Sequence, residues 1–311
     1  MINTSLTQAQ SNIAGIYKQR SNDPQGGASM FVLEDHKFVV VFFGGALVGE
    51  WSINGNDVEF KPFKSDQHFL IYGRHNPDLK TTSRIYFQGF NERETFIGFG
   101  EKQAEKQLLK RVFNVSPNCV PYPSVSKFRD IFSKIYLSDQ PDHFGDVESD
   151  PKAKRNIYAF TNKEKYNDFI AYYIKDNREE EPFYAKLKGG ELTFERENFS
   201  AKRPLPTSGE DFEFIEKIAH APRSTDKVFY NPFYNRTAED VNDIHNWKFN
   251  EKKNAYISFL NYTEGEEYKP EAQDAYNKMN IVYQFNILPL TDKVVAPFSI
   301  DNKPLFTATC D

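Results

Sequence analysis

Short runs rich in Val, Phe, Ile and Trp alternate with turn residues in the first part of the chain. The clearest runs cover residues 29–33, 37–43, 47–53 and 57–62. Just before Asn54-Gly55, Trp51 and Ile53 fall on one face of a strand, because side chains alternate with a period of two. Asn and Gly tolerate positive φ at low cost. The pattern therefore predicts an antiparallel meander with a hairpin over residues 49–60 and a type I′ turn.

The same alternation continues up to a proline-rich segment. Further apolar runs cover residues 16–19, 69–72, 83–89, 95–100 and 108–114. The total of about eight or nine strands is roughly the number that closes a small barrel. Three prolines then interrupt the pattern, and we place a linker at residues 116–123. The chain before it, residues 12–115, is predicted to form an all-β domain.

Beyond the linker the spacing of apolar residues becomes that of helices. Residues 128–136 and 166–174 each follow the spacing i, i+3, i+4, i+7, which predicts one buried helix face. Capping boxes at Thr161 with Glu164, Ser208 with Asp211, and Thr237 with Asp240 support helix starts. Strands are predicted between them at 182–188, 191–196, 228–230, 255–262, 281–288, 294–300 and 305–309. Residues 124–311 are thus predicted to form an α+β domain with an antiparallel sheet and three or four short helices, which makes the fold class of the whole chain α+β.

A set of glycines and aromatic residues near the start resembles a known family. The set consists of Gly15-x-Tyr17, Gly44-Gly45-Ala46-Leu47, Gly49-x-Trp51, Asn54-Gly55 and Val58-x-Phe60. It resembles the opening of the small lipocalin-like, calycin-type β modules of uncharacterised bacterial exported proteins, over about residues 14–63. The resemblance implies a closed or nearly closed antiparallel barrel or sandwich. It carries over no catalytic residue, because the pattern contains none.

Charge and the length of apolar runs argue against two classes of partner. The formal net charge is −5, and Lys and Arg are spread along the chain rather than gathered in a stripe. Because nucleic-acid binding relies on basic stripes, it is not predicted. No apolar run approaches the roughly 18–20 residues that a bilayer requires, so no transmembrane segment is predicted. Phosphate-binding and dinucleotide motifs are missing from the sequence, and no cofactor is predicted.

Aromatic residues are unusually frequent, at 15% of the chain, with 29 Phe and 17 Tyr. This bias predicts β-rich cores, and it also suits an aromatic-lined pocket. Phe229, Tyr230 and Tyr234 lie beside Asn and Arg residues, the combination that holds a sugar ring or another small amphipathic molecule. Together with Trp51 they are the candidate ligand-binding residues. Packing alone is the alternative explanation.

The cysteines and the N-terminus bear on the cellular compartment. Cys119 and Cys310 are candidates for one disulfide that closes the second domain, and two separate thiols are the alternative. The polar N-terminus lacks the apolar core of a signal peptide, and residues 7–10 are interpreted as the remnant of a removed export signal. With the family resemblance, this predicts a periplasmic or secreted protein.

Residues 139–150 form the densest polar cluster, with five carboxylates and one histidine. Candidate oxygen ligands for calcium are Asp142, Asp146, Glu148 and Asp150. His143, beside Asp146, is a candidate general base. A solvated acidic loop is the favoured interpretation, because the spacing of an EF-hand is not met.

Other histidines provide weaker candidates. His245 with Asp243 is a second candidate catalytic pair. His220 stands near the end of a predicted helix, and a three-histidine metal site would require it to converge with the two candidate bases. His68 and His75 flank one predicted strand and are expected to point to solvent.

Three functions remain open from the sequence. The leading hypothesis is a non-catalytic ligand-binding or interaction protein, with its site in the barrel mouth or at the domain junction and a small amphipathic molecule, a sugar or a protein as its partner. The alternatives are a hydrolase or lyase that uses a His/carboxylate pair of the second domain, and a structural subunit of a surface assembly that uses exposed edge strands. The side chains that line the largest pocket decide among them.

Overall fold

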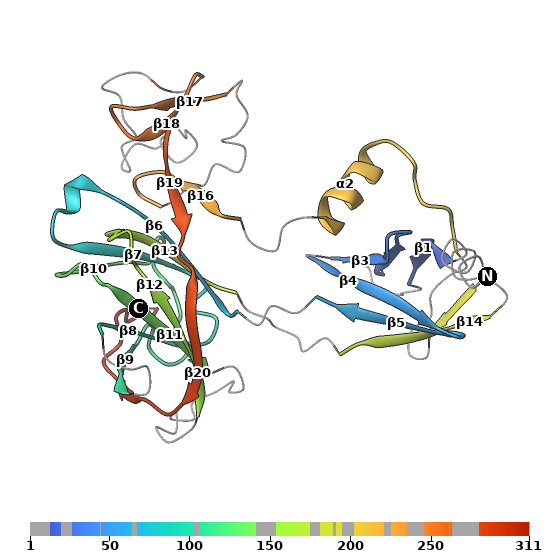
Figure 1. Cartoon of the computed structure of the whole chain (residues 1–311), viewed down its shortest axis with the longest axis horizontal. Coiled ribbons are helices and arrows are strands. Elements are labelled where there is room, and N and C mark those ends of the chain that lie inside the picture. The colour runs from blue at the N-terminus through green and yellow to red at the C-terminus, as the bar shows by residue number, and fades with distance from the viewer. Residues whose placement is uncertain are drawn as a thin grey trace. The chain divides into compact units, whose positions relative to one another are not determined.

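The computed structural model divides the chain into two compact units (Figure 1). Unit 1 comprises Met1–Asp66 and Asp176–Arg223, and unit 2 comprises Gln67–Lys175 and Ser224–Asp311. The residues that the structure describes are 13–19, 27–43, 45–63, 67–101, 106–140, 154–174, 181–188, 191–194, 202–220, 225–234, 246–260, 262 and 280–310. The unit bounds differ from the predicted domains at 12–115 and 124–311, because each unit is built from two separated stretches of chain.

Unit 1 contains one antiparallel sheet of seven described strands. They are β1 (Gly15–Lys18), β2 (Ser29–Val32), β3 (Lys37–Phe42), β4 (Gly45–Asn54), β5 (Asp57–Pro62), β14 (Phe183–Lys188) and β15 (Glu191–Phe194), and they pair in that order. The predicted hairpin is present, and its register pairs Asn54 with Asp57. The two-residue loop is therefore Gly55-Asn56. Gly55 has a φ of 66°, and glycine at the first loop position is typical of a type II′ turn rather than the predicted type I′ turn.

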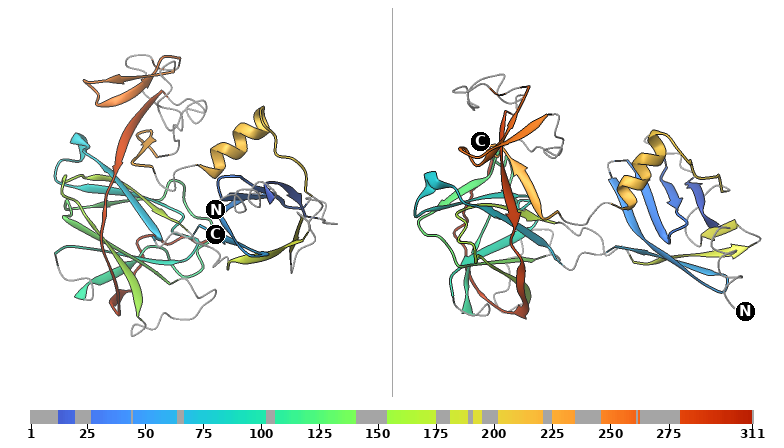
Figure 2. Two further views of the ribbon diagram at one scale, coloured as in Figure 1. Left: turned by 45° about the vertical axis from the view of Figure 1, so that its right-hand side comes forward. Right: turned by 45° about the horizontal axis from the view of Figure 1, so that its top comes forward.

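The sheet of unit 1 buries both of its faces. On one face Phe38, Trp51 and Phe60 form a packed aromatic core. On the other face Val39 packs with Ile215 of helix α2 (Glu210–Ala219). The uninterrupted apolar run of β3 follows from this arrangement, since alternate side chains enter two different cores. Figure 2 shows α2 lying across the sheet.

The described strands of unit 2 form two sheets. The first pairs its strands in the order β10 (Val125–Phe128), β7 (Ser83–Gln88), β13 (Asp168–Tyr173), β6 (Phe69–Arg74), β19 (Ile281–Ile287), β18 (Ala255–Ser258) and β17 (Trp247–Asn250), with β16 (Lys227–Tyr230) also beside β19. The second has the order β20 (Leu290–Ala296), β12 (Arg155–Thr161), β11 (Lys134–Gln140), β8 (Glu94–Phe99), β9 (Leu108–Arg111) and β21 (Ser299–Asp301). A short 3₁₀-helix, η1, covers Pro77–Leu79. The main core joins Phe69 and Phe169 of the first sheet to Leu137 and Phe160 of the second. Unit 2 is therefore a sandwich of two sheets.

The predicted α+β fold class is wrong, because the described chain is mostly strand and its single α-helix is α2. Residues 128–136 and 166–174, predicted as helices, contain strands β10, β11 and β13 instead. In β11, Ile135 and Leu137 enter the main core while Tyr136 enters a second core on the opposite face. A strand that is buried on both faces has a continuous apolar run, and such a run also satisfies helical spacing.

The helix that does form follows the predicted capping box at Ser208 with Asp211. Its N-cap is Gly209 rather than Ser208, and the cap makes no side-chain hydrogen bond. The capping box at Thr161 starts no helix, since Thr161 ends strand β12. The box at Thr237 with Asp240 lies outside the described residues. Within the part of the chain that the structure describes, no helix is long and apolar enough to cross a membrane.

A disulfide joins Cys119 to Cys310, the two candidates named from the sequence. Their Cα atoms are 5.2 Å apart and 191 positions apart in the sequence. Both cysteines belong to unit 2. The disulfide therefore closes a loop that begins and ends in unit 2. It links the C-terminal segment to the segment around Cys119.

Candidate functional site

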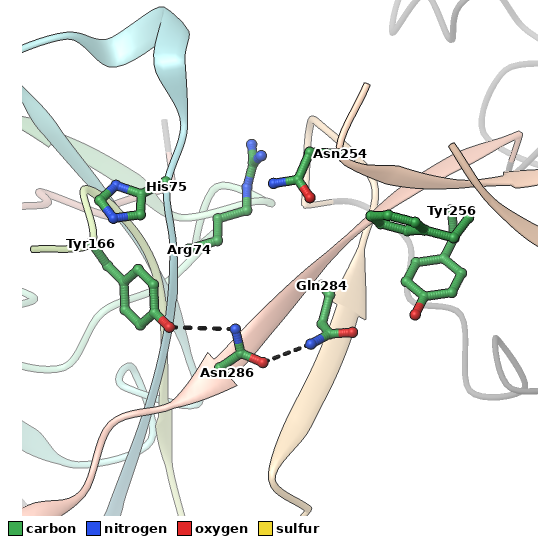
Figure 3. A pocket seen from close by; sticks show the side chains of 8 residues that line it. Arg74, His75, Tyr166, Asn254, Tyr256, Gln284 and Asn286 are labelled. Atoms are coloured by element: carbon green, nitrogen blue, oxygen red, sulfur yellow. Dashed lines mark hydrogen bonds between the residues drawn. The ribbon is translucent and has the colours of Figure 1, made fainter. Parts of the chain in front are cut away.

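A cavity of about 300 Å3 in unit 2 collects polar and aromatic side chains from four places in the sequence. We call it the amide pocket, and its lining residues are Arg74, His75, Tyr166, Phe249, Asn254, Tyr256, Gln284 and Asn286. Of the described residues, the lining thus has one guanidinium, one imidazole, three aromatic rings and three carboxamides. Figure 3 shows these side chains around a common space.

Strand β19 forms the base of the amide pocket. It pairs with β18 at its start, where Tyr256 is opposite Val282, and with β6 at its end, where Asn286 is opposite Gly73. Gln284 and Asn286 lie two residues apart and so project from the same face of the strand. Asn254 closes the other side from the turn between β17 and β18, where it has a positive φ of 46°. Asn tolerates this conformation better than most residues.

The carboxamides are held in a short hydrogen-bonded chain. Gln284 Nε2 donates to Asn286 Oδ1 at 2.7 Å, and Asn286 Nδ2 donates to the Tyr166 hydroxyl at 3.4 Å (Figure 3). The Tyr166 ring lies directly against Gly73, where an added Cβ would come within 2.6 Å of the ring. Gly73 is thus required for Tyr166 to reach Asn286. The amide chain is fixed in place, while the Gln284 oxygen remains as an acceptor for a ligand.

Arg74 joins the amide pocket to a buried charge cluster. Asp168 is fully buried and lies 2.7 Å from Arg74 Nη2. Arg84 also binds Asp168 through two nitrogens, at 3.2 and 3.0 Å. Asn76 Nδ2 donates to the same carboxylate at 3.0 Å, and the Tyr234 hydroxyl donates to it as well. One carboxylate therefore serves two guanidinium groups.

Burial lowers the pKa of Arg74, and the nearby Asp168 carboxylate opposes that effect. The residue is only 8% exposed. Its guanidinium carbon lies 3.8 Å from the centre of the Tyr283 ring, which is a cation–π contact. The charged group is held rigidly by an aromatic face and by an ion pair.

The four predicted ligand-binding residues are all buried, and two of them support the amide pocket from behind. Phe229 packs edge-on against Tyr256, with ring centres 5.3 Å apart. Tyr234 binds Asp168, and Arg84 lies over its ring at 4.7 Å. Tyr230 instead bonds to the Tyr172 hydroxyl at 2.6 Å and to Gln88 at 2.7 Å. In the same cluster, burial raises the pKa of Tyr172 to about 12, although its hydrogen bond with Tyr230 acts in the opposite direction.

Trp51, the fourth of these residues, belongs to the core of unit 1. Its indole Nε1 donates to the Leu33 carbonyl at 2.9 Å, and its ring stacks on His36 at 4.5 Å. It is 2% exposed. These contacts give it a structural role.

The predicted catalytic and calcium-binding residues lie outside the described residues. They are His143, His245, Asp142, Asp146, Asp243, Glu148 and Asp150. Within the described part of the chain, no group of three or more His, Cys, Asp or Glu side chains is arranged to hold a metal ion. Of the three histidines considered for a metal site, only His220 is among the described residues.

His220 lines a second cavity in unit 1, which at about 580 Å3 is larger than the amide pocket but is lined mainly by apolar and acidic side chains. We call it the helix groove, and it is lined by Leu33, Glu34, Asp35, Leu205, Pro206, Thr207, Phe212, Ile215, Glu216 and His220. His220 Nε2 lies 2.9 Å from Asp35 Oδ2, and Nδ1 lies 3.0 Å from the Glu216 carbonyl. The hydrogen bond with Asp35 raises the pKa of His220. Both ring nitrogens are therefore engaged by the protein itself.

His68 differs from the expectation that it points to solvent, whereas His75 is exposed as expected. His68 Nδ1 is 2.7 Å from Asp139 Oδ2, and the Tyr173 hydroxyl donates to the same oxygen at 2.9 Å. His75 lines the amide pocket and packs edge-on against Tyr166 at 5.4 Å. The His68–Asp139 pair connects the residue just before β6 in one sheet of unit 2 to strand β11 in the other.

Sequence reasoning missed most of the amide pocket. Gln284 and Asn286 did leave a signal, since they are the polar positions in the otherwise apolar run of β19, I-V-Y-Q-F-N-I. Polar side chains at alternate positions of a half-buried strand mark a face that is not core. Arg74 and Asn254 belong to no motif, and only the pairing of β6, β18 and β19 brings them together.

Comparison of the chain with protein-family models, with curated proteins and with solved structures gave no match. The fold and the pocket define a two-unit β protein with a small polar cavity in its sandwich unit. Its function is inferred from the chemistry of that cavity.

Proposed function

We propose that this protein is a non-catalytic binding protein whose site is the amide pocket and whose ligand is a small, sugar-like molecule. The observation that carries the proposal is the convergence of three carboxamides and three aromatic rings on a cavity of about 300 Å3. Ligand pockets range from about 300 to 1,000 Å3, so this cavity suits a ligand of one or two rings.

The lining matches the two kinds of surface that a sugar ring presents. Carboxamides both donate and accept hydrogen bonds, as hydroxyl groups do, so they pair with hydroxyls in either direction. The flat faces of Tyr256 and Phe249, whose ring centres are 5.2 Å apart, suit the apolar C–H face of a sugar ring. Phe249 is 45% exposed. Such exposure is expected of an aromatic ring at the rim of a binding site that a ligand does not yet cover.

The hydrolase or lyase alternative is less well supported. A general base needs a nitrogen or oxygen within hydrogen-bond reach of the substrate. In the helix groove, Asp35 and Glu216 occupy both nitrogens of His220. The amide pocket contains one imidazole, that of His75, but none of the described side chains that line it is a carboxylate that could orient that ring. Binding without chemistry is the simpler role for these residues.

Two further parts of the proposal concern family and location. The lipocalin-like character of unit 1 is supported by its antiparallel meander with the inner face filled by aromatic residues. A periplasmic or extracellular location is supported by the Cys119–Cys310 disulfide, since such bonds persist in oxidising compartments. Thiol labelling of the native protein without a reductant tests the second point, and labelling of both cysteines would contradict it.

Binding is tested by titrating the full chain with a panel of neutral methyl glycosides and disaccharides in a calorimeter. We expect at least one member to bind more tightly than about 10 mM. Tyr256→Ala removes one aromatic face, and Asn286→Leu keeps the side-chain volume but removes both hydrogen-bonding groups. Each variant should weaken binding by about tenfold.

Tyr184→Ala is the matched control, because Tyr184 is a half-exposed tyrosine on β14 of unit 1. It should bind as the wild type does. The proposed function fails if no saccharide of the panel binds, or if Tyr256→Ala and Asn286→Leu bind it unchanged.

A further inference from the structure

We infer that the ligand of the amide pocket carries a single negative charge, a carboxylate that Arg74 binds, as in an acidic monosaccharide of the uronic acid type. This inference rests on the proposed function and adds the chemical class of the ligand. It is carried by the charges, contacts and burial of Arg74 and its neighbours.

The first step is the charge of the cluster beside the pocket. Arg74 and Arg84 bring two positive charges, and Asp168 brings one negative charge. Donors from Arg74, Arg84, Asn76 and Tyr234 all converge on the two oxygens of Asp168. A carboxylate has about four lone-pair sites, so Asp168 is saturated. One positive charge is left without a carboxylate among the described residues.

The second step is the cost of that charge. An ion that is removed from water is destabilised unless an opposite charge or hydrogen bonds compensate it. Arg74 is 8% exposed, and burial lowers its pKa even though Asp168 lies beside it. The described side chains that line the amide pocket add no negative charge. An anionic group in the pocket would supply the missing compensation.

The third step is the hydrogen-bonding capacity that remains on Arg74. Its Nη2 contacts Asp168, and its buried Nε has no hydrogen-bond partner in the described structure. The guanidinium end of Arg74 and the Asn254 amide face the same space in Figure 3. A carboxylate seated there would accept hydrogen bonds from the guanidinium and from the Asn254 amide. A planar guanidinium matches the planar carboxylate in geometry.

Charge balance selects the carboxylate over a phosphate ester. One uncompensated positive charge is neutralised by one carboxylate, whereas a phosphate monoester carries about −1.5 to −2 at pH 7. A phosphate would therefore leave excess negative charge in a partly buried site. Comparing the binding of a uronate with that of a sugar phosphate that has the same ring distinguishes the carboxylate from the phosphate ester.

The experiment compares matched ligands on the full wild-type chain by calorimetry. The pairs are methyl glucoside with methyl glucuronide and methyl galactoside with methyl galacturonide, and glucose 6-phosphate provides the phosphate arm. We expect the uronide of a pair to bind about tenfold to a hundredfold more tightly than its neutral partner at low salt. The advantage should shrink as salt is raised, and glucose 6-phosphate should bind less tightly than the glucuronide.

Two variants assign the effect to the pocket. Arg74→Gln should abolish the preference for the uronide while changing neutral-sugar binding by less than about threefold. Because that variant disturbs a buried ion pair, Asn254→Asp provides a second test at an exposed turn position. It places a carboxylate beside Arg74 and should also abolish the preference for the uronide. Tyr184→Ala again serves as the control.

The outcomes separate this inference from the proposed function. Equal binding of neutral and acidic partners, or tighter binding of glucose 6-phosphate, overturns the carboxylate while the binding site stands. A preference for the uronide that survives in both variants also overturns it. Absence of binding by every sugar overturns the proposed function and this inference together.

Discussion

The two units reach similar β structures by different routes. In unit 1, strands β1 to β5 pair in chain order, so that neighbours in the sheet are neighbours in the sequence. In unit 2, β13 lies between β6 and β7, and β19 pairs with β6 more than 200 positions earlier, as Asn286 opposite Gly73 shows. The pairing of β1 to β5 can be read from turns and alternation, although β14 joins β5 from a distant part of the chain. The pairing of unit 2 cannot, and that unit contains the amide pocket.

The largest expected effect concerns the Cys119–Cys310 disulfide of unit 2. Replacing Cys119 and Cys310 together by Ser should lower the free energy of unfolding of unit 2 by about 5 kcal/mol, because the closed loop spans 191 positions. Hydrogen–deuterium exchange by mass spectrometry localises the loss. Faster exchange throughout unit 1, with unit 2 unchanged, would contradict this prediction.

The next effect concerns the buried charges of unit 2. Asp168→Asn leaves Arg74 and Arg84 buried without a carboxylate and should destabilise unit 2 by about 3–5 kcal/mol. Asp292→Asn, at an exposed position of β20, is the matched control and should change stability by less than about 0.5 kcal/mol. Chemical denaturation measures both. Equal effects of the two substitutions would show that the charge cluster is not a stabilising unit.

A smaller effect is expected where α2 covers the sheet of unit 1. Ile215 is 3% exposed and packs with Val39, so Ile215→Ala should cost about 3 kcal/mol. Phe214 is on the same helix but 53% exposed, and Phe214→Ala should be nearly neutral. Sugar binding in unit 2 should be unaffected by either change. If Ile215→Ala abolished binding, the two units would not be separable in function.

The smallest effect is the pH dependence of the helix groove. The pKa of His220 is raised above 6.5 by its hydrogen bond with Asp35, so protonated His220 is favoured in the folded state. Partial burial raises the pKa of Asp35, but its hydrogen bonds with His220 and Lys37 lower it by more, so the net shift is a decrease. The pair therefore stabilises unit 1 when His220 is protonated and Asp35 is ionised. That contribution is lost as pH rises through the raised pKa of His220, and also as pH falls through the lowered pKa of Asp35.

This contribution is small, about 0.5 kcal/mol, because the two side chains are 39% and 45% exposed. Melting temperatures of wild type and His220→Gln, measured from pH 5 to pH 9, isolate it. The two proteins should converge above the raised pKa of His220. A constant difference across the whole range would refute the assignment.

How much of the candidate site the sequence revealed depends on the strand concerned. The polar positions of β19 interrupt an apolar run, so Gln284 and Asn286 were visible in principle. Arg74 ends one strand and Asn254 occupies a turn, and neither differs in the sequence from an ordinary surface residue. Phe229 and Tyr234 were identified as aromatic residues of interest, but they act from behind the pocket wall. Their burial depends on Tyr256 and Asp168, which are contributed by other strands.

The sequence by itself determined the local elements of this protein: the hairpin at Asn54-Gly55, the β3 run, the single described helix and a pair of cysteines able to bond. These depend on turn chemistry and on side-chain period, which act over a few residues. Only the tertiary structure decided that β11 and β13 are strands, because a strand buried on both faces has the same apolar spacing as a helix. It also decided where the charge of Arg74 lies, since long-range strand pairing, not sequence spacing, placed Asp168 and the amide pocket beside it.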